Sequence, residues 1–121
     1  MDINIPGINS KRGIELCDGD TEMYIRFLAL YVSNVPPPLE SMRKVSEETL
    51  RSYVLCVHGV KSNCEIIGAE EAGEMAKQLE ATAKAGDLAW VLAHNDTLIK
   101  TIETLIGNIK SWFQKTGHSM N

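Results

Sequence analysis

Residues 46–68 read SEETLRSYVLCVHGVKSNCEIIG, and this stretch decides the fold. Its apolar positions recur at alternating steps of three and four residues, which is the period of one buried face of an α-helix. Ser46 and the two glutamates after it are a typical helix start, because serine caps free amides and acids favour the positive end of the helix dipole. Gly68 is a typical helix end. The predicted buried positions are Leu50, Tyr53, Val57, Val60, Cys64 and Ile67.

The same spacing predicts further helices on both sides of this one. We expect a short helix that ends before Gly19, a helix from Asp20 that bends or restarts at Pro36–Pro38 and continues to Val45, a helix from about Ala69 to Ala85, and a last one from Leu88 to beyond Trp112. Long helices joined by short loops pack as antiparallel neighbours. The predicted fold is therefore all-α: an antiparallel up-down-up-down four-helix bundle with a short extra N-terminal helix. Residues 10–116 would form the bundle, residues 1–9 a tail or linker, and residues 117–121 a C-terminal tail.

Composition narrows the class of protein. The chain has 121 residues, 44% of them hydrophobic and 23% charged, which favours one soluble domain. A net charge of −4, with scattered lysines and arginines, argues against binding to nucleic acid. The apolar runs are too short to span a bilayer, and the start lacks a signal-peptide pattern. Three cysteines, an odd number, indicate a reducing compartment. We therefore expect a cytoplasmic protein without direct membrane contact.

His58 is the residue most suited to chemistry. At about 100° per residue it lies about 100° away from Val57, outside the apolar seam, with Lys61 and Ser62 one turn further along the helix. Its neighbour Gly59 makes the helix about 1 kcal/mol less stable than alanine would at an interior position. Because it has no side chain, it leaves room for a partner to approach His58. An exposed imidazole is a good nucleophile near neutral pH. A nearby ammonium group can offset the negative charge that a phosphoryl group carries during transfer.

The segment HGVKSNCEIIGA, residues 58–69, resembles the signature of histidine-containing phosphotransfer (HPt) domains. That signature has a histidine, a lysine three residues later, a small residue after it, and Gly-Ala ten and eleven residues after the histidine. The matching residues are His58, Lys61, Ser62, Gly68 and Ala69. The helix order is also similar, so the resemblance covers about residues 8–115. Many members have Thr, Ser or Ala at the position of Gly59 and Gly at the position of Ser62, and both departures keep the surface small.

The resemblance implies a phosphorelay intermediate rather than an autonomous enzyme. His58 would accept a phosphoryl group from, or donate it to, the aspartate of a receiver domain of a response regulator or hybrid histidine kinase. Lys61 would stabilise that group, Ser62 would be a small polar neighbour, and Gly68 would end the helix. No cofactor is expected here, because Mg²⁺ would lie in the partner receiver. The isolated domain would be a monomer. Residues 5–9, IPGIN, resemble the linker before the C-terminal HPt domain of hybrid sensor histidine kinases.

The partner would dock on the helix surface around His58. The candidate contact residues are Arg51, Val54, Leu55, Gly59 and Glu65, although an ordinary exposed helix face explains them equally well. Two other functions fit the sequence less well. A module that docks a receiver without transfer would need neither His58 nor Lys61, and a sensor-kinase dimerisation domain would carry an acidic residue directly after the histidine.

Other histidines and the cysteines are weaker candidates. Cys56 and Cys64 point away from the face of His58 on the predicted helix, so four closed metal ligands are not at hand and no metal site is predicted. His94 lacks the lysine pattern and His118 lies in the C-terminal tail, so we expect no chemical role for either histidine.

Overall fold

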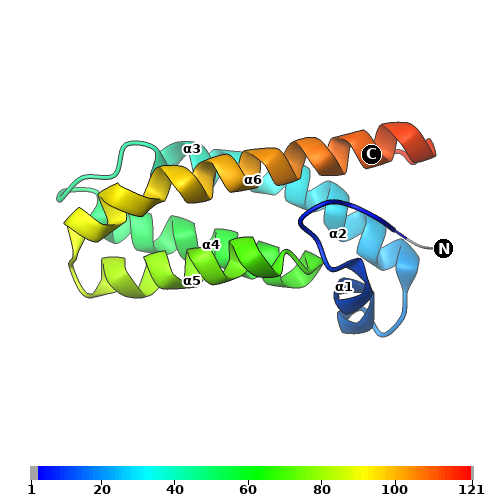
Figure 1. The fold of residues 1–121 in the computed structure, drawn as a ribbon, viewed down its shortest axis with the longest axis horizontal. Coiled ribbons are helices and arrows are strands. Elements are labelled where there is room, and N and C mark those ends of the chain that lie inside the picture. The colour runs from blue at the N-terminus through cyan, green and yellow to red at the C-terminus, as the bar shows by residue number, and fades with distance from the viewer. Residues whose placement is uncertain (1–2, 121) are drawn as a thin grey trace.

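The chain is all-helical in a computed structural model that describes residues 3–120. Six α-helices and no β-strand occur within these residues. Figure 1 shows that the long helices lie lengthwise beside one another and that successive ones run in alternate directions. The helices are α1 (Ser10–Leu16), α2 (Thr21–Asn34), α3 (Pro36–Met42), α4 (Leu50–Ile67), α5 (Glu70–Lys84) and α6 (Leu88–Thr116).

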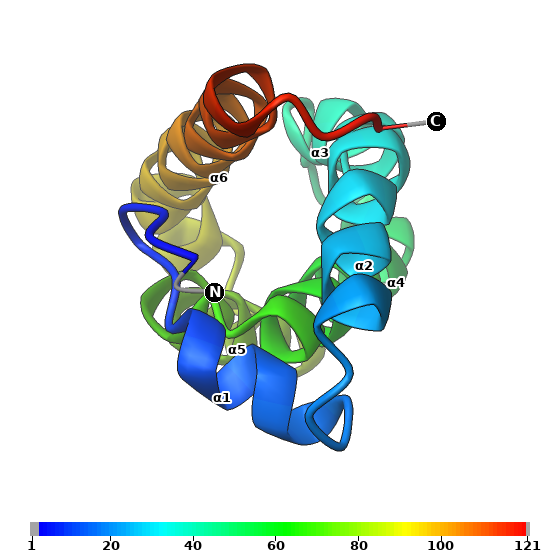
Figure 2. The ribbon, with the colours of Figure 1, turned by 90° about the vertical axis from the view of Figure 1, so that its right-hand side faces the viewer.

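The helices surround one apolar core. Seen end-on, α6, α5, α4 and the α2–α3 segment follow one another around a common axis, and α1 crosses one end (Figure 2). Helices α4 and α5 pack more extensively than any other pair, and α2 contacts both α4 and α6. Small residues of α5 permit this close packing. The largest fully buried side chains include Tyr24, Tyr31, Phe113, Leu28, Met42 and Ile67.

Helix α4 ends where the sequence predicts, directly before Gly68. Gly68 has φ +82°, a left-handed conformation in which a side chain is strained. Its carbonyl accepts a hydrogen bond of 2.8 Å from the backbone amide of Asn9. A Cβ on Gly68 would collide with the backbone oxygen of Asn9. The glycine therefore both ends the helix and allows the start of the chain to approach it.

The three prolines interrupt the backbone hydrogen bonds without ending the helical path. Val35, between α2 and α3, keeps helical angles of φ −79° and ψ −37°. Its amide bonds to Tyr31 and its carbonyl accepts from Leu39, both at 3.1 Å. Prolines at the start of α3 lack only amides that would be free in a first turn. The structure thus has a restart at Pro36, one of the two outcomes that the sequence predicts.

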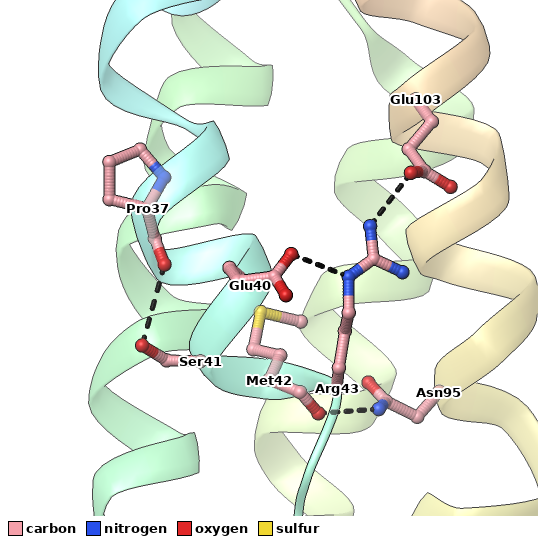
Figure 3. Close-up of polar contacts among 7 residues, drawn as sticks. All are labelled: Pro37, Glu40, Ser41, Met42, Arg43, Asn95 and Glu103. Atoms are coloured by element: carbon pink, nitrogen blue, oxygen red, sulfur yellow. Dashed lines mark hydrogen bonds and ion pairs between the residues drawn. The ribbon is translucent and has the colours of Figure 1, made fainter.

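The connection between α3 and α4 differs from our expectation. Helix α3 ends at Met42 instead of continuing to Val45, and α4 begins at Leu50 instead of Ser46. The Met42 carbonyl accepts a hydrogen bond of 2.8 Å from the Asn95 amide of α6 (Figure 3). Ser46 forms a closed turn, in which its amide donates to Thr49 Oγ1 at 2.8 Å. The serine therefore starts a turn before the helix and does not cap the helix itself.

An ion-pair bridge also holds the end of α3 against α6. Arg43 donates from Nε to Glu40 and from Nη2 to Glu103, with both distances 2.7 Å (Figure 3). Its first partner is in α3 and its second is in α6. This bridge and the Asn95 bond therefore attach the end of α3 to α6 at two points.

The N-terminal segment packs against the helices, although we expected a tail or linker. Residues 3–9 contain no helix or strand, yet Ile3 and Ile5 are only 3% and 4% exposed. The Asn108 side-chain amide of α6 donates to the carbonyl of Pro6 at 3.2 Å. The only sequence signal for this packing is the short alternation of the buried Ile3 and Ile5 with the exposed Asn4 and Pro6.

The C-terminal end is similarly in contact with α6. Gly117 ends the helix, and the ring of His118 stacks on Trp112 at a centroid distance of 5.0 Å. Among residues 3–120, no helix has both the length and the apolar character required to cross a bilayer.

Candidate functional site

His58 lies on the outer side of α4, where the periodicity of that helix places it. Tyr53, Val57, Val60 and Cys64 fill the core-facing positions and are buried. The His58 side chain retains 57% of its exposure. The imidazole is therefore accessible to a second molecule, as the sequence predicts.

A buried carboxylate from the neighbouring helix holds this imidazole. Glu80 of α5 has only 6% of its side chain exposed, and its Oε2 lies 2.8 Å from His58 Nδ1. Its other oxygen, Oε1, lies 2.8 Å from Lys61 Nζ. Lys84 Nζ approaches Oε2 at 3.1 Å. The site is therefore a four-residue cluster across α4 and α5, with the carboxylate at its centre.

The charge state of Glu80 follows from these contacts. Burial by itself raises the pKa of the carboxyl group, but the hydrogen bonds from Lys61, His58 and Lys84 outweigh it and lower the pKa to about 2. The same contact with Glu80 raises the pKa of Lys61. Near neutral pH the cluster therefore contains a carboxylate and two ammonium groups.

The carboxylate selects one tautomer of His58. An ionised carboxylate can only accept hydrogen bonds, so Nδ1 must carry the proton that it shares with Glu80. In the neutral ring the lone pair then belongs to Nε2. The arrangement thus prepares Nε2 for attack, with Glu80 ready to stabilise positive charge on the ring.

The two small residues predicted beside His58, Ser62 and Gly59, differ in what they contribute to the site. The Ser62 hydroxyl donates to the His58 backbone carbonyl at 3.1 Å. This bond lies within α4 and uses the only proton that the hydroxyl can donate. A side chain at Gly59 would enter open space, because a Cβ built there meets nothing within 4 Å. The chain's own packing therefore does not require a glycine at this position.

The predicted docking residues extend along α4 on either side of His58. Leu55 is 76% exposed. Arg51 and Glu65 are exposed, and Val54 is half-buried. Beyond them, a groove of about 370 Å³ is lined by Leu16, Cys17, Phe27, Ser62, Glu65 and Ile66. The face around His58 is thus mixed in chemistry and partly hollowed.

Sequence reasoning missed Glu80 and Lys84. A signal was present, because Glu80 continues the series Ala72 and Ala76 at steps of four residues, and both alanines are buried. An acid in phase with a buried stripe needs a partner of opposite charge. The partner on the same helix is Lys84, four residues later, but the contact to His58 depends on how α4 and α5 align.

The remaining candidates have local partners. His94 stacks on Trp90 at 3.8 Å and its Nδ1 contacts the Trp90 carbonyl at 2.8 Å. Cys17, Cys56 and Cys64 are free thiols, and Cys64 lies 3.3 Å from the hydroxyl of Tyr31 in the core. Within the described residues, no three His, Cys, Asp or Glu side chains cluster as metal ligands would.

A scan against protein-family models finds no match to this chain, and searches of curated proteins and of solved structures find none either. The geometry of the cluster and the sequence motif are therefore the features that point to a function.

Proposed function

We propose that this protein is an HPt-type phosphotransfer domain, which carries a phosphoryl group on His58 between receiver-domain aspartates. The observation that carries the proposal is the exposed imidazole whose Nδ1 lies 2.8 Å from the buried Glu80 carboxylate. A surface histidine without a chemical task has no need of such a partner. The motif of His58, Lys61 and Ser62 supports the same conclusion.

The proposal includes a fold assignment. We assign the helices α2–α3, α4, α5 and α6 to an up-down-up-down four-helix bundle, with α1 as the short additional helix. The alternating directions of these helices and their arrangement around one core support the assignment. In such a bundle the nucleophile stands on a rigid helix, and the partner approaches from the side.

The transfer step follows from the tautomer. His58 Nε2 attacks the phosphorus of an aspartyl phosphate and forms a P–N bond, while the bond from phosphorus to the aspartate oxygen breaks and the carboxylate leaves. The ring becomes positively charged, and its Nδ1 proton stays hydrogen-bonded to Glu80. Lys61 offsets charge on the phosphoryl oxygens. The chain needs no nucleotide site for this reaction, and Mg²⁺ would belong to the partner's acidic pocket.

Docking residues complete the proposal. Leu55 and Val54 offer apolar contact, whereas Arg51 and Glu65 offer charged contact on the same helix. A receiver domain must bring its aspartate to Nε2, and the open space at Gly59 permits a close approach. A module that only docks would use the same face without the cluster, so the reaction and not the binding distinguishes the two functions.

The decisive experiment measures transfer of acid-labile label from phosphorylated receiver domains. His58→Gln should abolish labelling while the helical circular dichroism stays the same. His94→Gln is the matched control, because that histidine also lies exposed on a helix, and it should be labelled like the wild type. Lys61→Ala should become labelled more slowly without losing affinity for the receiver. Labelling of the His58→Gln variant, or a wild type that binds receivers without becoming labelled, would contradict phosphotransfer.

A further inference from the structure

Lys84 is the member of the cluster to which the proposed transfer step gives no role. It is the last residue of α5, one turn after Glu80, and its ammonium group lies 3.1 Å from Glu80 Oε2. That oxygen is the same one that holds His58 Nδ1 at 2.8 Å. Lys84 and the imidazole therefore share an acceptor, whereas Lys61 is held on the other oxygen of Glu80, Oε1.

We propose that Lys84 is a second phosphoryl-binding residue, which acts together with Lys61 once His58 is phosphorylated. The inference depends on the proposed phosphotransfer function and deepens it. The shared oxygen of Glu80 places the ammonium group next to the ring, and a phosphoryl group on Nε2 projects from that ring into solvent. The Lys84 side chain is 62% exposed, so it can turn toward the new oxygens.

The charge of the cluster gives the reason. Before transfer, the carboxylate of Glu80 and the two ammonium groups give the side chains around the imidazole a single net positive charge. A doubly charged phosphoryl group on a positively charged ring then brings a net negative charge to the same place. Without Lys84 the unphosphorylated cluster would be neutral, and the phosphoryl oxygens would face Glu80 with only Lys61 to balance it. Charge-assisted hydrogen bonds to phosphoryl oxygens are among the stronger contacts that a protein surface can offer.

The two lysines are suited to different parts of this task. Lys61 is 20% exposed and is held on Oε1, so it keeps the carboxylate in position. Lys84 is more exposed and shares its oxygen with the imidazole. Lys84 is thus the lysine that can exchange acceptors while Lys61 retains Glu80.

Ordinary surface electrostatics would give Lys84 a different role. A lysine in the last turn of a helix favours the helix dipole, and a pair at four residues' separation stabilises a helix modestly. Both effects concern stability alone. The test therefore needs a readout at the phosphorus atom.

The experiment labels the chain with phosphoramidate, a small donor that requires no receiver. His58 Nε2 forms the P–N bond, the donor's own P–N bond breaks, and ammonia leaves with its electron pair. We expect Lys84→Gln to lower the initial rate about threefold to fivefold, the range of an exposed ion pair. We also expect a changed ³¹P chemical shift of the phosphohistidine at fixed pH. Lys84→Arg should restore most of the rate, and Lys100→Gln, an exposed lysine of α6, should match the wild type.

The outcomes separate the two proposals. Equal rates and an unchanged ³¹P shift in Lys84→Gln, with a wild type that is labelled at His58, would overturn the role of Lys84 alone. A wild type that accepts no label from phosphoramidate or from any phosphorylated receiver would overturn phosphotransfer itself. If Lys84→Gln lost both labelling and helicity, Lys84→Arg would decide the question. That variant keeps the positive charge, so the proposal requires it to retain the labelling rate.

Discussion

At the scale of single residues, Glu80 determines what His58 can do. The carboxylate is nearly buried, yet three donors from two helices surround it. It fixes the ring's tautomer and also joins α4 to α5. One residue thus links the chemistry of the site with the stability of the fold.

We predict that Glu80 contributes stability that is lost in acid. Its pKa is about 2 in the folded chain against an ordinary value of 4.5. The contribution is therefore complete above about pH 4.5, and it disappears as the pH falls toward 2, because the unfolded chain binds the proton first. Since His58 and Lys84 are largely exposed, screening reduces the effect to about 1–2 kcal/mol.

Urea unfolding of the wild type and of Glu80→Gln, at about pH 6 and about pH 3, checks this prediction. The wild type should lose more free energy of unfolding than the variant between the two conditions, since all other carboxyl groups are common to both. An equal loss in both proteins would show that Glu80 is not held ionised by its neighbours.

Only one of the two main features of the site, the exposure of His58, could be predicted from the sequence. The exposure of His58 follows from the helical period, because Val57 and Val60 determine which side is buried. Glu80 could not be assigned to His58 in the same way. The two residues are on different helices, and their contact depends on how far α5 is shifted along α4, which no spacing within one helix reveals.

At the scale of elements, α4 carries a weakness that its own packing does not explain. Gly59 lies inside this helix, where glycine costs about 1 kcal/mol relative to alanine. Gly107 of α6 also has open space where its side chain would be. The two glycines therefore form a matched pair, one beside His58 and one on another helix.

We predict that Gly59→Gln and Gly107→Gln both raise the free energy of unfolding, by about 0.5–1 kcal/mol each. Only Gly59→Gln should slow phosphoryl transfer from a receiver domain, on the order of tenfold, because the longer side chain blocks the approach to Nε2. Labelling by phosphoramidate should remain near the wild-type rate in both. Equal transfer rates from a receiver would remove Gly59 from the docking surface.

The elements themselves were largely predictable, and their ends less so. Gly68 was predictable because a left-handed residue is needed where α4 ends. The start of α4 was not, since Ser46 has the composition of a cap but bonds with Thr49 in a preceding turn. The end of α3 depends on Asn95, which is distant in sequence.

At the scale of the whole molecule, the fold includes the segment before α1. Ile3 and Ile5 are part of the apolar core, and Asn9 is bonded to the end of α4 and to Glu70 of α5. A side-chain hydroxyl, that of Ser10, closes back on the Ile3 carbonyl. The folded unit therefore begins earlier than residue 10, where the sequence pattern placed it.

We predict that Ile5→Ala lowers the free energy of unfolding by about 2–4 kcal/mol, the cost of a cavity in a packed core. Ile66→Ala is the control, because Ile66 is 41% exposed on α4 and should change stability by less than about 0.5 kcal/mol. Chemical denaturation of both variants measures the difference. Similar values for the two variants would mean that residues 3–9 are dispensable to the fold.

The placement of His58 and Glu80 on separate helices makes the imidazole a reporter of helix registry. A slip of α5 by one residue along α4 would move the carboxylate by about 1.5 Å and turn it by about 100° around its axis. Nδ1 would then lose its acceptor, and the proton could occupy either nitrogen. Reactivity at Nε2 is in this sense a property of the seam between two helices, and any influence that shifts this seam would alter the nucleophile without touching it.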